Sequence, residues 1–138
     1  MLKKINHIAV AVKDAEATAR LFKDTIGLEG GEIELNENFE VKVAFFSLGG
    51  VKIELVEPLN PQSGLAKYLE KKGEGIHHIA IEVDDVEKAL QHYKAEGVEL
   101  IHEKPEPGAH DTLVGFLHPK STGGVLFELC QTALRKAE

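Results

Sequence analysis

The sequence predicts an α+β fold built from two tandem βαβββ modules. The first observation is a repeat, in which INHIAVAV at residues 5–12 recurs as IHHIAIEV at residues 76–83. This match lies 71 positions further along the chain and aligns His7 with His78. A period of this length is too long for a solenoid unit and fits two fused half-domains.

The second observation is a shorter repeat near the end of each module. GGVKIEL at residues 49–55 recurs as GGVLFEL at residues 123–129, which aligns Glu54 with Glu128. Each module therefore carries one histidine and one glutamate at matching places. We expect residues 1–138 to form a single domain that contains both modules.

Module one is expected at about residues 4–57. Alternating Ile and Val predict an opening strand at 4–12. Asp14 is a suitable N-cap for the helix that follows, and Gly27 is a suitable stop. The apolar face of that helix would consist of Ala15, Ala19, Phe22 and Ile26. Three further strands are expected at 31–35, 40–48 and 51–57, the last two joined by a Gly49-Gly50 turn.

A linker of about residues 58–74 follows, with a short helix between a Ser63 cap and Gly73. Module two is then expected at about 75–131. Its strand at 76–83 precedes a helix that Asp84 or Asp85 caps and Gly97 ends. That helix would bury Val86, Ala89, Leu90 and Tyr93. Strands are expected at 98–103, 112–117 and 124–130, with a loop at 104–111 whose two prolines exclude a central strand, and a polar tail from Thr132.

The composition limits the function classes. Apolar residues make up 43% of the chain and charged residues 28%, as in ordinary globular proteins. The net charge of −7 argues against a nucleic-acid partner, which requires clustered basic residues. A single cysteine excludes an internal disulfide, and we expect a cytoplasmic protein. We see no signal peptide and no apolar run of the roughly 20 residues that span a membrane.

Strand alternation indicates which way the repeated residues point. In the opening strand, the branched side chains of Ile8, Val10 and Val12 share the face expected to pack on the helix, and His7 takes the other face. His78 lies opposite Ile79, Ile81 and Val83 in the same way. The same rule separates Glu54 from Val51, Ile53 and Leu55, and Glu128 from Val125, Phe127 and Leu129. All four polar residues should therefore project from the face that the helices do not cover.

Two imidazoles and two carboxylates on one face are suited to a divalent metal. Such ligands favour Zn, Co, Mn, Fe or Ni over Cu(I). Two protein ligands from each module would leave positions open for water or substrate, as in catalytic sites.

The other candidate ligands are better explained without a metal. His77 has Asn6 as its counterpart and is expected to have a supporting or structural role. Glu82 has Ala11 as its counterpart and is expected at the substrate side or the rim. Cys130 is expected to be a small packing residue. The remaining histidines, expected to face solvent, are His92, His102 and His110.

The doubled plan, with one His and one Glu in each copy, resembles the vicinal oxygen chelate superfamily, which includes glyoxalases, extradiol dioxygenases and fosfomycin-resistance proteins. Its methylmalonyl-CoA epimerases are the most similar group. The motifs that carry the resemblance are INHIAVAV, IELVEPLNPQSGLAKYLEKKGEGIHHIAIEV and FLHPKSTGGVLFEL, which together cover most of the chain. The resemblance implies that both modules join edge to edge in a half-open, eight-stranded barrel around a metal.

The resemblance also implies an activity and a ligand set. The metal ligands would be His7, Glu54, His78 and Glu128. The reaction would be epimerisation of methylmalonyl-CoA at C2 through a metal-stabilised enolate, with Glu128 as one of two proton-transfer groups. Many epimerases carry Gln at the position of Glu54. Some carry a second proton-transfer Glu where this chain has Val43, which leaves the second group unassigned.

The remaining expectations follow from the same resemblance. The ion would be Co²⁺, with Mn²⁺, Zn²⁺, Ni²⁺ or Fe²⁺ as alternatives, and the partner an acyl-CoA. Family members are commonly homodimers. His118 and Lys120 are candidates to hold the substrate carboxylate or CoA, and equally candidates for ordinary loop residues. The alternative activity is that of a glyoxalase-type lactoylglutathione lyase, and a third, non-enzymatic class is a drug-sequestering protein of the bleomycin-resistance kind.

Overall fold

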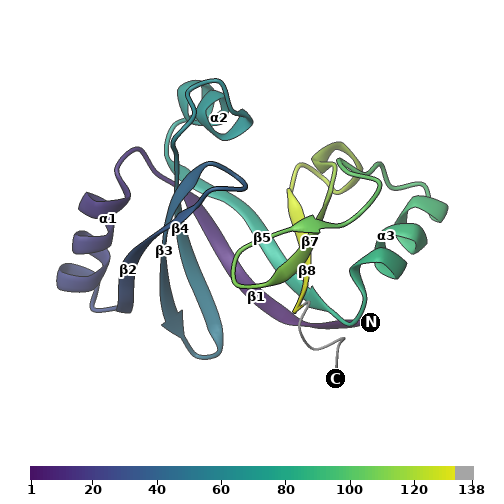
Figure 1. The fold of residues 1–138 in the computed structure, drawn as a ribbon, viewed down its shortest axis with the longest axis horizontal. Coiled ribbons are helices and arrows are strands. Elements are labelled where there is room, and N and C mark those ends of the chain that lie inside the picture. Colours follow the sequence, from purple (N-terminus) through teal and green to yellow (C-terminus); the bar gives the residue numbers. More distant parts are fainter. Residues whose placement is uncertain (133–138) are drawn as a thin grey trace. The chain divides into compact units, whose positions relative to one another are not determined.

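A computed structural model describes residues 1–132 of the chain (Figure 1). Contacts between residues divide the chain into two compact units. The module-one unit consists of His7–His77. The module-two unit consists of Met1–Asn6 together with the chain from His78 onward. The polar tail was predicted from Thr132 onward, and its residues after Thr132 lie outside the described residues. That the whole chain is one domain stays a prediction.

The module-one unit contains one helix-covered sheet. Its elements are β1 (Leu2–Ala11, from His7 onward), α1 (Ala15–Leu21), the π-helical turn η1 (Phe22–Ile26), β2 (Glu29–Asn36), β3 (Val41–Leu48), β4 (Val51–Pro58) and α2 (Gly64–Lys72). The strand order is β2-β3-β4-β1. Strand β1 runs parallel to β4, and the other neighbours are antiparallel. Helix α1 lies along these strands in Figure 1.

The module-two unit repeats this plan. Its elements are β5 (Gly75–Val83, from His78 onward), α3 (Val86–Ala95), β6 (Glu106–Pro107), β7 (Thr112–Leu117), the 3₁₀ turn η2 (Pro119–Ser121) and β8 (Phe127–Thr132). The strand order is β5-β8-β7-β6. Strand β5 runs parallel to β8, and the other neighbours are antiparallel. The predicted α+β class and both βαβββ modules are confirmed.

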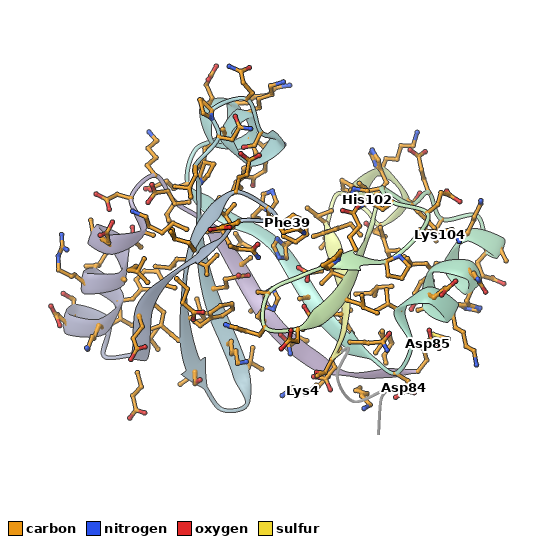
Figure 2. The ribbon with its side chains drawn as sticks, in the orientation of Figure 1. Lys4, Phe39, Asp84, Asp85, His102 and Lys104 are labelled. Atoms are coloured by element: carbon orange, nitrogen blue, oxygen red, sulfur yellow. The ribbon has the colours of Figure 1, made fainter. Side chains whose placement is uncertain are left out.

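Helix boundaries follow the predicted caps. The side chains of Asp14, Ser63 and Asp85 accept hydrogen bonds from backbone amides three residues later, at 3.0, 3.1 and 3.1 Å. Asp85 therefore caps α3, and Figure 2 shows it at the start of that helix. These bonds satisfy amides that have no partner within their own helix. Among the described residues, no helix has the length and apolar character needed to cross a membrane.

Each unit has its own hydrophobic core between helix and sheet. In module one the buried cluster comprises Val12, Ala15, Ala19, Ala44, Phe46 and Leu55. In module two it comprises Val83, Val86, Ala89, Leu90, Leu117 and Leu129. The predicted apolar faces of both strands and helices meet in these clusters. The core therefore fixes which face of each sheet stays away from the helices.

Two predictions of local structure are wrong. The first helix does not continue its α-helical face to Ile26, because the chain widens into a π turn there and leaves that side chain 62% exposed. The strand expected at 98–103 is only a single bridge from Leu100 to Leu117. The edge strand of the module-two sheet is instead β6, which contains Pro107 and is two residues long.

The last strand also begins later than predicted. It starts at Phe127, because Gly123 and Gly124 adopt positive φ and the amide of Gly124 bonds back to the carbonyl of Pro119 at 2.8 Å. Val125, expected on the helix-facing side, is 37% exposed as a result.

Candidate metal centre

The module-one unit brings His7 and Glu54 together. Strands β1 and β4 are parallel neighbours with Ala9 opposite Glu54, so the histidine two residues earlier on β1 reaches the same carboxylate. The Nε2 atom of His7 lies 3.1 Å from Oε1 of Glu54. Both residues are buried, with exposed fractions of 8% and 7%.

The module-two unit builds the same pair from β5 and β8. Ala80 lies opposite Glu128 in the register, and His78 precedes that alanine by two residues. The distance from Nε2 of His78 to Oε1 of Glu128 is 2.9 Å. The exposed fractions are again 8% and 7%. The two modules thus contain one buried imidazole–carboxylate pair each, as the repeat predicted.

Both pairs lie on the sheet face that the helices do not cover. In module one, Ile53 and Leu55 pack in the core with α1, and Glu54 points the other way between them. In module two, Phe127 and Leu129 pack in the core with α3, on either side of Glu128. The orientation predicted from alternation is confirmed within each unit.

Each pair has an aromatic neighbour that sequence reasoning missed. Phe45 lies opposite Glu54 across β3 and β4, and its ring meets that of His7 edge-on at 6.4 Å. Phe116 lies opposite Glu128, and its ring meets that of His78 edge-on at 5.7 Å. The signal was present, because these phenylalanines are 71 positions apart, like the histidines. Such contacts restrict the orientation of an imidazole ring.

The donor atoms in these pairs fit a divalent cation. A buried carboxylate needs a positive partner or strong hydrogen-bond donors, because burial removes its hydration. The imidazole beside it, as a neutral group, can bind a metal ion. Imidazole nitrogen with carboxylate oxygen is a ligand set for divalent transition ions. The pairs therefore support binding of a divalent metal.

The two loop residues predicted at the substrate make local contacts. Nδ1 of His118 accepts a hydrogen bond from the amide of Lys120 at 3.1 Å and so caps η2. The exposed Lys120 ammonium lies 2.8 Å from Glu99. Its hydrogen bond is the main reason that the pKa of Glu99 is lowered from its ordinary value. A substrate role for either loop residue stays a prediction.

Several other candidates have contacts of their own. The ring of His77 meets Tyr68 edge-on at 4.7 Å, which fits a structural role. Cys130 is buried, and its thiol lies 3.6 Å from the carbonyl of Ile81, consistent with packing. Oε1 of Glu82 accepts a hydrogen bond from Asn6 at 3.4 Å.

The remaining candidates divide between exposed and buried sites. His92 and His110 are exposed, as predicted. His102 is only half-exposed, because its Nε2 pairs with Glu106 at 3.0 Å. Val43 is 2% exposed, and its aliphatic side chain offers no group for proton transfer.

Comparison with known proteins identifies the class of protein to which this chain belongs. Residues 6–116 match the family model of the Glyoxalase/Bleomycin resistance protein/Dioxygenase superfamily, and the chain belongs to that superfamily. It is 41% identical to the mitochondrial methylmalonyl-CoA epimerase of Bos taurus over 131 residues, 94% of this chain and 75% of that protein. It is also 41% identical to the ethylmalonyl-CoA/methylmalonyl-CoA epimerase of Cereibacter sphaeroides, over 95% of this chain and 99% of that protein.

A solved structure extends the likeness to three dimensions. A methylmalonyl-CoA epimerase in complex with methylmalonyl-CoA and NH₄⁺ matches with a TM-score of 0.90 and 34% identity, over 96% of both chains. Within its superfamily, the chain belongs to the methylmalonyl-CoA epimerase family.

Proposed function

We propose that this enzyme epimerises methylmalonyl-CoA at C2, with one divalent ion held by His7, Glu54, His78 and Glu128. The observation that carries the activity is the likeness, over nearly the whole chain, to an epimerase in complex with methylmalonyl-CoA. The ligand set is supported by the two buried imidazole–carboxylate pairs. Both the sequence repeat and the local geometry give each module an equivalent histidine–glutamate pair.

The chemistry explains why such a site is useful. The proton at C2 lies between a thioester and a carboxylate, and its removal leaves an enolate whose negative charge develops on oxygen. A bound divalent ion supplies positive charge for that oxygen as a Lewis acid. Stabilisation of charge where it develops is usually the largest contribution to catalysis.

Glu128 is the proposed base. Its carboxylate takes the C2 proton from one face of the substrate, which leaves the bonding electrons in the enolate. A proton then reaches C2 from a second group on the opposite face, which inverts the centre. The aliphatic side chain of Val43 cannot supply that proton, so the second group lies elsewhere in this enzyme.

Glu54 distinguishes this site from epimerases with Gln at that position. Its carboxylate adds a negative charge, which should bind the ion more tightly. The same charge should weaken the ion as a Lewis acid.

Solvent exchange tests the enolate directly. With Co²⁺ present, deuterium from D₂O should enter C2 of methylmalonyl-CoA, and the metal-free protein should not catalyse this exchange. Glu128→Gln should lose far more exchange rate than metal affinity. Glu54→Gln is the matched control in the other module: it should mainly weaken metal binding and keep more exchange than Glu128→Gln when the ion is saturating. Near-normal exchange by Glu128→Gln would show that the base is another residue.

Metal stoichiometry tests whether both modules share an ion. One ion per chain, lost after His7→Ala and equally after His78→Ala, is expected. Two ions per chain, each lost separately, would mean that each module has its own site. We further propose that the native ion is Co²⁺ and that the enzyme is a cytoplasmic homodimer. Metal analysis of the protein as purified and light scattering check the ion and the dimer.

A glyoxalase-type lactoylglutathione lyase is the second candidate function. The family model that matches the chain includes glyoxalases, and the His/Glu/His/Glu set suits their proton transfer as well. Assays with methylglyoxal plus glutathione, run beside methylmalonyl-CoA, separate the two activities. A tightly bound stoichiometric metal would argue against a drug-sequestering protein.

A further inference from the structure

One lysine lies on the same sheet face as the module-one ligand pair. Lys52 precedes Glu54 by two residues on β4, so their side chains share a face. In the parallel register it lies opposite His7 on β1. Its side chain is exposed, in contrast to the two buried residues of the pair.

Phe45 links this lysine to the pair. The Nζ atom of Lys52 lies 5.9 Å from the centre of the Phe45 ring, within the range of a cation–π contact. The same ring meets His7 edge-on and lies opposite Glu54 in the register. The ammonium is therefore held on the pair's side of the sheet by a neutral ring.

Among the described residues, Lys52 takes part in no ion pair within 4.0 Å, and its ammonium contacts the Phe45 ring instead. Lys42, on the neighbouring strand β3, differs: it points to the helix side and pairs with Glu16 at 2.8 Å. Lys52 therefore presents its ammonium on the sheet face of Glu54 without an ion-pair partner among the described residues.

An anionic substrate would need such a charge. A methylmalonyl group carries a free carboxylate, which Glu54 repels at short range, and the whole chain has a net charge of −7. An ammonium on the same face offsets this repulsion. A lysine acts here as a compact point charge on a flexible stem, which suits the recognition of a single carboxylate.

We propose that Lys52 binds the free carboxylate of the acyl group and so selects CoA thioesters that carry a second carboxylate. This inference rests on the proposed function and adds a specificity-determining residue to it. The phosphates of CoA are the other anions that a lysine could bind, and the experiment must separate them from the acyl carboxylate.

Measuring the binding of two thioesters distinguishes the acyl carboxylate from the CoA phosphates. Malonyl-CoA has the free carboxylate and propionyl-CoA lacks it, while their CoA portions are identical. The affinity of each for the cobalt-loaded enzyme is measured by calorimetry. Lys52→Met should weaken malonyl-CoA about fivefold, the upper range for an exposed ion pair, and change propionyl-CoA less than about twofold. Lys52→Arg should recover most of the loss, and the matched control Lys42→Met should change neither.

The possible outcomes distinguish this inference from the proposed function. Equal weakening of both thioesters by Lys52→Met would assign the lysine to CoA phosphate or to folding and overturn the inference. No weakening of either would also overturn it. A wild-type enzyme that binds neither thioester would overturn the proposed function itself. Because Lys52 is exposed on a strand, the methionine variant should fold, and unchanged circular dichroism and metal content check this.

Discussion

Replacing Gln131 with Met should destabilise the enzyme through one buried hydrogen bond. Oε1 of Gln131 accepts from the amide of Val86, the first residue of α3, at 2.7 Å. The exposed fractions of these residues are 4% and 0%, so water cannot replace the lost acceptor. Methionine keeps the side-chain volume but leaves the amide without a partner, which costs about 1–3 kcal/mol.

The first module offers a matched control. Oε1 of Glu57 accepts from the amide of Ala15, the first residue of α1, at 2.9 Å. Ala15 is as fully buried as Val86, but Glu57 is only half-buried, so water can take the place of its carboxylate after Glu57→Met. Its removal also relieves repulsion with Asp14 and Glu16, because one carboxylate oxygen from each of the three residues lies within 4.8 Å of the others. The loss should be less than about half of that for Gln131→Met.

Urea unfolding with a chelator present measures both variants without a contribution from bound metal. For Gln131→Met the midpoint should fall by roughly 1 M with an unchanged slope. If the midpoint stays at the wild-type value, or if Glu57→Met lowers the stability as much as Gln131→Met, burial does not determine how much each hydrogen bond contributes to stability.

Three further predictions follow from other parts of the structure. Gly115→Ala should cost about 1–3 kcal/mol in the same urea assay, because its Cβ would lie 2.8 Å from Cδ1 of the buried Leu90; no change would mean that this side chain repacks freely. Because the Lys120 ammonium lowers the pKa of Glu99, their pair should stabilise the enzyme above the ordinary carboxyl pKa and stop doing so as pH falls through the lowered value. Lys120→Met should raise that pKa in an NMR titration, and an unshifted titration would exclude the pair in solution. A chelator should lower the melting temperature and one equivalent of Co²⁺ restore it, whereas His7→Ala should respond to neither; equal responses would refute the metal site.

Much of the fold was predictable because its signals are local. The caps at Asp14, Ser63 and Asp85 need only a suitable side chain just before a helix. Strand alternation likewise assigned His7 and Glu54 to the face away from the helix. The internal repeat then supplied their partners in the second module.

The errors arose where the pattern of apolar residues does not determine the path of the backbone. The segment at 98–103 has strand-like residues, but the amide of Val98 bonds back to Tyr93 at the end of α3, and only Leu100 bridges to β7. The π turn that exposes Ile26 cannot be recognised from the periodicity of apolar residues. Phe45 was missed because it lies within a strand of mainly apolar residues, although its counterpart Phe116 lies at the same offset as the histidines.

The modules connect their last two strands differently. Two glycines join β3 to β4, and nine residues, 118–126, join β7 to β8. Both glycines have positive φ, so an inserted residue would disrupt the turn, and a one-residue slip of β4 would rotate Glu54 to the opposite face. The longer connection can gain or lose residues while β5 and β7 keep Glu128 in register. Since the duplication, insertions and deletions should therefore have been purged at the first hairpin and tolerated at the second beyond the candidate substrate residues His118 and Lys120, which makes that part of the second connection the safer position for engineering new loops.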